Sequence, residues 1–150
     1  MKPPRDIVLV SIQAILLSIY LFRLPEVDMH FDSTIRYSGL AVSVLGGIII
    51  IYAIITLNNN LTAFPTPKSN GVLITRGLYK YIRHPIYTGI LLLTSGYGTY
   101  SENTLRLCVS VGLLILFLYK ARYEESLLRN KFPEYGNYIK QSGMFLPKIF

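Results

Sequence analysis

The sequence predicts an all-α protein whose helices form a polytopic bundle in a membrane. Its 150 residues are 51% hydrophobic, and the mean hydropathy of +0.41 is high for a water-soluble domain. The apolar residues are concentrated in four blocks, and the longest, residues 37–57, holds 21 residues without a charge. Such a block can cross a hydrocarbon core of about 30 Å. We therefore expect a single membrane domain over residues 1–150, with about four transmembrane helices and a C-terminal cytoplasmic helical extension.

The net charge of +7 comes from 15 Lys and Arg residues against 8 acidic residues, and the positions of these basic residues relative to the predicted helices indicate a membrane topology. If both termini are cytoplasmic, only three of these residues lie on the opposite side: Arg23, Arg36 and Arg106. The other twelve lie on the cytoplasmic side: Lys2, Arg5, Lys68, Arg76, Lys80, Arg83, Lys120, Arg122, Arg129, Lys131, Lys140 and Lys148. This asymmetry is the positive-inside pattern of membrane proteins. It accounts for the basic charge without a nucleic-acid partner and predicts that both termini face the cytoplasm.

The first two apolar blocks, residues 7–22 and 37–57, predict two N-terminal transmembrane helices within residues 1–60. Basic residues precede the first block, as in a signal peptide, but no small-x-small cleavage site follows it. We therefore interpret this block as a membrane helix. In the second block, Ser43 and Gly47 form a small-xxx-small pair, which is typical of close helix packing in lipid.

The third and fourth blocks, residues 86–100 and 107–119, predict a helical hairpin. Pro85 suits the first position of the third helix, where its missing N–H has no cost, and His84 then occupies the cap. Three typical turn formers separate the two helices: Gly96, Gly98 and Asn103. Both uncharged blocks are short for a full membrane crossing, so we expect these helices to begin or end in protein-lined surroundings.

The fourth helix is predicted to continue beyond its apolar block, because no helix breaker occurs before Pro133. A tail rich in aromatic residues and lysines follows, and we expect it to lie against the membrane surface. The single cysteine, Cys108, excludes a disulfide framework and is interpreted as a buried, inert thiol. The sequence contains no CxxC motif, HExxH motif or Gly-rich phosphate loop, so no metal site is predicted.

Two polar clusters occur at the predicted cytoplasmic ends of the third and fourth helices. The first contains Tyr79, Tyr81, Arg83, His84 and Tyr87, and the second contains Lys120, Arg122, Glu124 and Glu125. Because a tight hairpin joins the two helices, the clusters should face each other. Two interpretations without a function remain: an interfacial anchor for the first cluster, and a solvent-exposed helical face for the second.

The same residues resemble a family of integral membrane methyltransferases. The segment LITRGLYKYIRHPIYTGILL is followed, after a hydrophobic hairpin, by YEESLL and FPEYGNY. This combination is similar to the isoprenylcysteine carboxyl methyltransferases and the related phospholipid N-methyltransferases. The resemblance covers residues 61–147, and it implies that residues 61–150 form a cofactor-binding helical hairpin and tail. It also implies S-adenosyl-L-methionine as the cofactor and a membrane lipid or lipidated small molecule as the acceptor.

The resemblance assigns two groups of site residues. Those implied to bind the cofactor are Gly71, Val72, Leu73, Ile74, Tyr79, His84, Pro85, Ile86, Tyr87, Glu124 and Glu125. A basic residue on the substrate side is implied to be catalytic, and both Lys120 and Arg122 remain candidates for it. The residue types suit the cofactor, because free N–H groups at a helix start bind carboxylates, glutamates pair with ammonium groups, and tyrosine rings attract cations.

The predicted function is methyl transfer from S-adenosyl-L-methionine to a lipid-like acceptor on the cytoplasmic side. Carboxyl O-methylation of an isoprenylcysteine-type substrate is favoured, and N-methylation of a phospholipid amine is the close alternative. An amine must lose a proton, which His84 or a glutamate can accept, so the residue types do not separate the two reactions. Two further alternatives are an NADPH-dependent reductase of the membrane sterol type and a non-catalytic membrane subunit.

Overall fold

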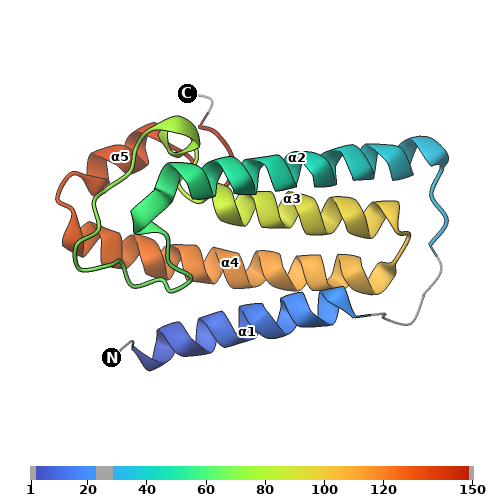
Figure 1. The fold of residues 1–150 in the computed structure, drawn as a ribbon, viewed down its shortest axis with the longest axis horizontal. Coiled ribbons are helices and arrows are strands. Elements are labelled where there is room, and N and C mark those ends of the chain that lie inside the picture. Colours follow the sequence, from blue (N-terminus) through green and yellow to red (C-terminus); the bar gives the residue numbers. More distant parts are fainter. Residues whose placement is uncertain (1–2, 23–28, 149–150) are drawn as a thin grey trace.

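The computed structural model describes residues 3–22 and 29–148, which form an all-helical bundle. Its elements are α1 (Pro4–Leu21), α2 (Ser33–Leu57), α3 (Pro85–Tyr100), α4 (Thr104–Lys131) and α5 (Tyr135–Gln141), with 3-10 turns η1 (Asn58–Asn60) and η2 (Gly77–Lys80). Figure 1 shows the four long helices side by side, with α5 and the long connection from α2 to α3 gathered at one end. Lys2 and Arg23, which contribute to the predicted charge asymmetry, lie outside the described residues.

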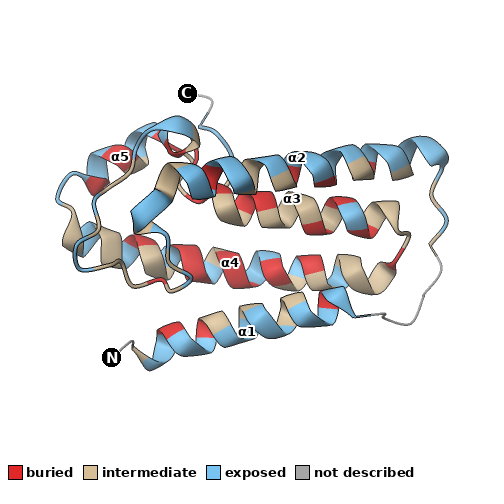
Figure 2. Cartoon of the chain, viewed as in Figure 1, coloured by how far each residue is buried: buried red, intermediate tan, exposed pale blue. Residues whose placement is uncertain are grey.

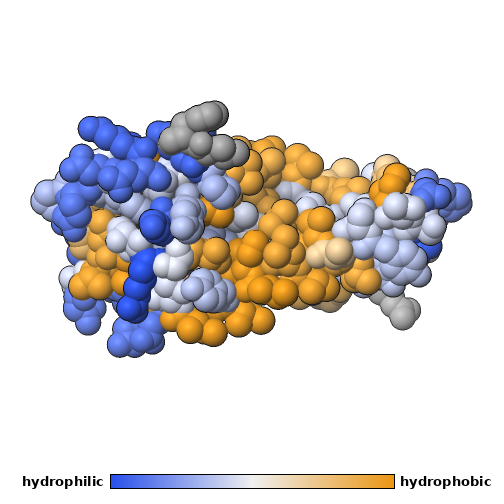
Figure 3. All heavy atoms as spheres, turned by 90° about the horizontal axis from the view of Figure 1, so that it is seen from above, coloured by the Kyte–Doolittle hydropathy of each residue, from blue (hydrophilic) through white to orange (hydrophobic). Residues whose placement is uncertain are grey.

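The protein is an integral membrane protein by the length and composition of its helices. Three helical stretches among the described residues are long and apolar enough to cross a membrane: Pro4–Leu21, Ser33–Asn60 and Thr104–Lys131. Figure 3 shows a hydrophobic band between two more polar ends on one face of the molecule. α3 has only 16 residues and spans about 24 Å at 1.5 Å per residue. Its first residue, Pro85, is fully buried, so this helix begins inside the protein, as the sequence predicts.

α2 and α3 approach closely because small residues line their contact. A Cβ atom on Gly46 would lie 2.5 Å from the amide nitrogen of Leu93, and one on Gly89 would lie 2.8 Å from the carbonyl oxygen of Gly46. The hydroxyl of Ser43 donates to the carbonyl of Leu93 at 3.1 Å. The predicted partner of Ser43 was Gly47, but a Cβ there would meet its nearest neighbour only at 3.9 Å. Gly46, one position earlier, makes the close contact.

The turn between α3 and α4 is shorter than the sequence suggests. Gly96 and Gly98 lie inside α3, so the prediction that they form the turn is wrong. The chain reverses over residues 101–103, where Glu102 has a φ of 52°. Asn103 caps α4 as a turn former should, and its side chain accepts a hydrogen bond from the amide of Arg106 at 3.0 Å. α4 then continues without a break to Lys131, which confirms the predicted extension.

α1 lies at one edge of the bundle, where it packs mainly against α4 (Figure 1). Asp6 near its start is fully buried, and its carboxylate accepts a hydrogen bond from the amide of Thr66 at 3.1 Å. This contact joins α1 to the connection between α2 and α3. Figure 2 shows that α1 and α2 expose much of their surface, as expected for helices that contact lipid. Cys108 on α4 is also exposed, so the prediction of a buried thiol is wrong.

Candidate active site

A cavity of about 390 Å³ occupies the end of the bundle where the α2–α3 connection, α5 and the end of α4 meet. Its lining comes from every long helix, from the connection and from the C-terminal part of the chain. All but two of the sequence-predicted site residues line it: Gly71, Val72, Leu73, Ile74, Tyr79, His84, Pro85, Ile86, Tyr87, Lys120 and Glu124. The exceptions are Arg122 and Glu125. The start of α3 and the end of α4 therefore meet as predicted.

The start of α3 offers backbone amides to this cavity. Pro85 occupies the first turn and His84 is the N-cap residue, both as predicted. His84 has a φ of −123° and a ψ of 59°, outside the helical region, which is disfavoured for a residue before proline. No side-chain hydrogen bond caps this helix start in the part of the chain that the structure describes. The first amides of α3, at cavity-lining residues, can therefore bind an anionic group of a ligand.

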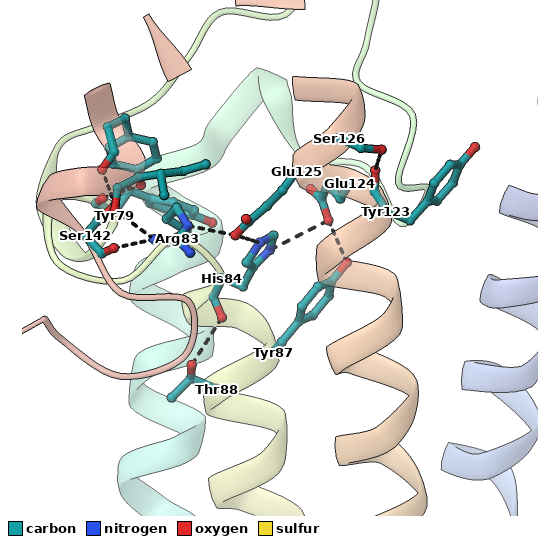
Figure 4. A network of polar contacts seen from close by, with 12 residues as sticks. Tyr79, Arg83, His84, Tyr87, Thr88, Tyr123, Glu124, Glu125, Ser126 and Ser142 are labelled. Atoms are coloured by element: carbon teal, nitrogen blue, oxygen red, sulfur yellow. Dashed lines mark hydrogen bonds and ion pairs between the residues drawn. The ribbon is translucent and has the colours of Figure 1, made fainter. Parts of the chain in front are cut away.

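Glu125 contacts two residues of the segment before α3 without lining the cavity. One oxygen of its carboxylate accepts a hydrogen bond from Nε of Arg83 at 2.7 Å and lies 3.2 Å from Nε2 of His84 (Figure 4). The side chains of Arg83 and Glu125 are only 8% and 7% exposed, so this is a buried ion pair. Arg83 also donates to the backbone carbonyl of Ser142. Glu125 therefore contacts both His84 and Arg83 and lies outside the cavity lining, and its predicted part in cofactor binding stays a prediction.

Glu124 has a different environment although it is adjacent in sequence. Its carboxylate accepts a hydrogen bond from the hydroxyl of Tyr87 at 2.9 Å and lies 3.8 Å from Nδ1 of His84. Its side chain is 26% exposed and lines the cavity. His84 thus lies between two carboxylates, one buried and one open to the cavity (Figure 4). The open carboxylate can pair with a cationic group of a ligand.

Stacked rings form one wall of the cavity. The rings of His84 and Tyr87 are parallel, with centroids 5.3 Å apart, and Tyr87 stacks on Phe117 with centroids 4.6 Å apart. Nζ of Lys120 lies 5.3 Å from the centroid of the Tyr87 ring. The hydrogen bond to Glu124 and the two stacking contacts hold the ring of Tyr87, which lines the cavity, in one orientation.

The two basic residues that the resemblance offers for the substrate side lie in different environments. Lys120 lines the cavity and is only 1% exposed, whereas Arg122 is exposed and lies outside the cavity lining. Nζ of Lys120 donates to the side-chain oxygen of Gln13 at 2.6 Å and to the carbonyl of Ala63 at 3.0 Å. Gln13 belongs to α1 and was missed as a site residue. Its only sequence signal is its position as a polar side chain within an apolar block.

The C-terminal tail pairs with the segment that precedes α3. The amide of Gly143 donates to the carbonyl of Tyr81 at 3.0 Å, and the amide of His84 donates to the carbonyl of Met144 at 3.1 Å. The hydroxyl of Thr88 donates to the carbonyl of Phe145 at 2.8 Å. The sequence suggested that the tail lies against the membrane surface. The structure shows that it also pairs with the segment that carries His84 and so forms part of the frame of the site.

Buried tyrosines connect this frame to the cavity. The hydroxyl of Tyr138 donates to the backbone carbonyl of Tyr79. Burial raises the pKa of Tyr138 to about 12, and it raises the pKa of Tyr79 and of Tyr135 well above the ordinary value for a phenol. All three line the cavity and keep their protons at neutral pH, so they are hydrogen-bond donors there.

The described residues contain no group of three or more His, Cys, Asp and Glu side chains that could hold a metal ion. The cavity instead combines backbone amides, an open carboxylate, aromatic rings and one buried ammonium group.

Residues 35–135 match the model of the phospholipid methyltransferase family, over more than half of the sequence. The chain belongs to the phospholipid methyltransferase family. The predicted methyltransferase-family resemblance is thereby confirmed.

Individual relatives in this family differ in their names. The chain is 32% identical over 84 residues to a cobalt-zinc-cadmium resistance protein of Cupriavidus metallidurans, covering 55% of this chain and 38% of that protein. It is 30% identical over 128 residues to a protein-S-isoprenylcysteine O-methyltransferase of Tribolium castaneum, covering 81% of this chain and 44% of that protein. The chain thus spans less than half the length of these two relatives.

A solved structure shares the fold. The eukaryotic intramembrane Ras methyltransferase ICMT matches with a TM-score of 0.70 and 23% sequence identity, over 99% of this chain and 55% of that chain. The match extends over α1, which the family model does not include. The helix that carries Gln13 therefore belongs to the shared arrangement of helices.

Proposed function

We propose that this phospholipid methyltransferase family member is a membrane methyltransferase that uses S-adenosyl-L-methionine and modifies a lipid-like acceptor. The observation that carries the proposal is the meeting of His84, Glu124 and Lys120 around one cavity at the end of a membrane bundle. The cavity is assigned to the cytoplasmic side, because most basic residues lie at this end and the cofactor is water-soluble.

The cavity suits the chemical groups of the cofactor. The first amides of α3 bind its carboxylate, and Glu124 pairs with its ammonium group. The rings of Tyr79 and Tyr87 offer faces to the sulfonium or the adenine, and the segment from Gly71 to Ile74 lines the same space. When bound, S-adenosyl-L-methionine supplies a methyl group on a positively charged sulfur atom.

In this proposal, Lys120 binds the acceptor. Two of the three N–H bonds of its ammonium group are used by Gln13 and Ala63, so one remains for an oxygen atom of the substrate. Lys120 would hold a substrate carboxylate there, so that one of its oxygen lone pairs faces the methyl group that the cofactor would supply. The carboxylate has no proton to lose, so no general base is required. Apolar side chains such as Ile54 and Ile90 keep water from the reacting atoms.

Carboxyl O-methylation of an isoprenylcysteine-type acid is therefore the favoured reaction, and it is supported by the name of the Tribolium relative. The description of the family favours N-methylation of a phospholipid amine as the second candidate. That reaction releases a proton, and the arrangement of His84 between Glu124 and Glu125 provides an acceptor for it.

Binding and turnover assays test the proposal in sequence. Purified protein in detergent is titrated first with S-adenosyl-L-methionine and then, separately, with NADPH. Saturable binding of S-adenosyl-L-methionine supports a methyltransferase, binding of NADPH alone supports a reductase, and binding of neither supports a non-catalytic subunit. Mass spectrometry of membrane lipids incubated with protein and cofactor then identifies the acceptor by the gain of a methyl group. Oxygen and nitrogen methylation are separated by alkaline hydrolysis, which releases the transferred methyl group of a methyl ester as methanol but leaves an N-methyl group attached to nitrogen.

A further inference from the structure

A groove runs along the outer surface between α1 and α4, separate from the candidate active site. Val8, Ile12 and Leu16 line it from α1, and Ile115 lines it from α4. Its volume is about 620 Å³, and its surface is almost entirely apolar. Gly112 also lines the groove, and a Cβ atom there would reach only ordinary van der Waals contact with Leu16, at 3.7 Å, so a side chain at this position would occupy the groove without a clash. The two helices thus leave space between them at membrane depth.

One cation stands at the end of this groove. Arg5 lines it at the end of the bundle that holds the cavity, and its guanidinium donates to the hydroxyl of Tyr119. The guanidinium carbon lies 5.0 Å from the ring centroid of Tyr119 and 4.1 Å from that of Tyr123. These contacts hold the cation in one place. A guanidinium has five N–H donors in a planar fork that suits phosphate, so it can bind an anion while it keeps the tyrosine contact.

The length of the groove matches one leaflet of a membrane. From Arg5 to Leu16 the helix rises about 16 Å at 1.5 Å per residue. Half of a hydrocarbon core of about 30 Å is about 15 Å. An acyl chain that lies along the groove therefore reaches from the headgroup level to the centre of the bilayer, with its headgroup beside the guanidinium.

We propose that the groove between α1 and α4 binds an anionic glycerophospholipid, with one acyl chain along Val8, Ile12 and Leu16 and its phosphate on Arg5. Charge complementarity selects this occupant, because Arg5 is the only charged residue among the described residues that line the groove. A second copy of the chain fits poorly, since a two-fold contact in the membrane would bring the two Arg5 side chains to the same level. The bound lipid would hold α1 against α4 and so support the contact between Gln13 and Lys120.

Native mass spectrometry of the full chain tests this proposal independently of methyltransferase activity. Purified protein is incubated with equal amounts of phosphatidylglycerol and phosphatidylcholine that have the same acyl chains. The wild type should retain phosphatidylglycerol over phosphatidylcholine by about fivefold, the usual effect of one cation near an anionic headgroup. Arg5→Gln should bring this ratio close to one. Gly112→Leu, which fills the groove, should lower the retention of both lipids.

Arg129→Gln is the matched control, because Arg129 is an exposed arginine on α4 outside the groove lining. It removes the same charge and should leave the ratio unchanged. An equal loss of selectivity in Arg129→Gln would mean that net charge alone selects the lipid, and the proposal would fail. It would also fail if inorganic phosphate displaced the retained lipid, since the site would then bind a simple anion, or if Gly112→Leu retained as much lipid as the wild type.

Discussion

Removal of Glu125 should mainly lower the stability of the protein, whereas removal of Glu124, its neighbour on α4, should mainly lower its affinity for the cofactor. Glu125→Ala leaves the guanidinium of Arg83 buried without its carboxylate, in an ion pair whose side chains are 7% and 8% exposed. Breaking one partner of a buried pair costs about 3–5 kcal/mol. Glu124→Ala removes a carboxylate that is 26% exposed and accepts one hydrogen bond from the hydroxyl of Tyr87. That loss costs only about 1 kcal/mol.

Thermal unfolding in detergent measures the first half of this contrast. The chain has no tryptophan, so far-ultraviolet circular dichroism is the suitable signal. At about 2–4 °C per kcal/mol, Glu125→Ala should lower the melting temperature by about 6 °C or more, and Glu124→Ala by less than about 4 °C. Glu134→Ala, at an exposed position just beyond α4, is the control and should leave the melting temperature unchanged.

Cofactor affinity should change in the opposite order. Glu124→Ala removes the carboxylate that we assign to the ammonium group of S-adenosyl-L-methionine, so affinity should fall by about tenfold or more. Glu125→Gln keeps a hydrogen-bond acceptor for Arg83 and should bind the cofactor within about threefold of the wild type. The reasoning is refuted if Glu125→Ala has the melting temperature of the wild type. It is also refuted if Glu124→Ala is the less stable of the two variants and binds the cofactor with wild-type affinity.

Three further predictions follow from the site. Lys120→Gln should raise the KM for the acceptor by about tenfold or more with little change in cofactor affinity, whereas Arg122→Gln should match the wild type; equal effects in both variants would remove Lys120 from the acceptor side. Gly143→Ala should lower turnover and the melting temperature together, because its Cβ would lie 1.8 Å from the carbonyl oxygen of Leu146; wild-type turnover would mean that the tail does not frame the site. Because burial raises the pKa of Tyr138 from 10.0 to about 12, its contribution to stability should be complete below pH 10 and be lost as the pH rises through about 12. Melting temperatures in Tyr138→Phe and the wild type, compared between pH 8 and about pH 11, would contradict this if they changed in parallel.

The sequence predicts most of the helical frame, because strong local signals define it. Pro85 and His84 occupy the predicted positions at the start of α3, since proline fixes the backbone angle of the first turn. α4 extends to Lys131 because good helix formers continue until Pro133. The meeting of the polar ends of α3 and α4 was also predictable, because a short turn keeps hairpin ends at the same level.

Features that depend on the rotation of a helix were not predictable. Gly46, and not Gly47, packs against α3, because the choice depends on which face of α2 meets its neighbour. Cys108 faces outward for the same reason: an apolar block in a membrane protein identifies no buried face. Gly96 was interpreted as a turn former, but its missing side chain allows α2 to approach α3, with a Cβ distance of 2.5 Å to the carbonyl oxygen of Gly39.

Contacts between segments that are distant in the sequence could not be predicted either. Gln13 contacts Lys120 across 107 positions of sequence, and no local pattern reports such a pair. The different environments of Glu124 and Glu125 arise because neighbouring residues on a helix point about 100° apart, so one faces Arg83 and the other faces the cavity. The pairing of Gly143 with Tyr81 depends on how α5 turns the chain back toward the site.

Photo-crosslinking of radiolabelled S-adenosyl-L-methionine, followed by peptide mapping, tests most directly whether the start of α3 and the end of α4 enclose one cofactor. The label should appear in residues 71–87 and 120–128, and excess unlabelled S-adenosyl-L-methionine should remove it from both. Labelling of only one segment, labelling elsewhere, or labelling that unlabelled cofactor does not reduce would contradict the proposed site.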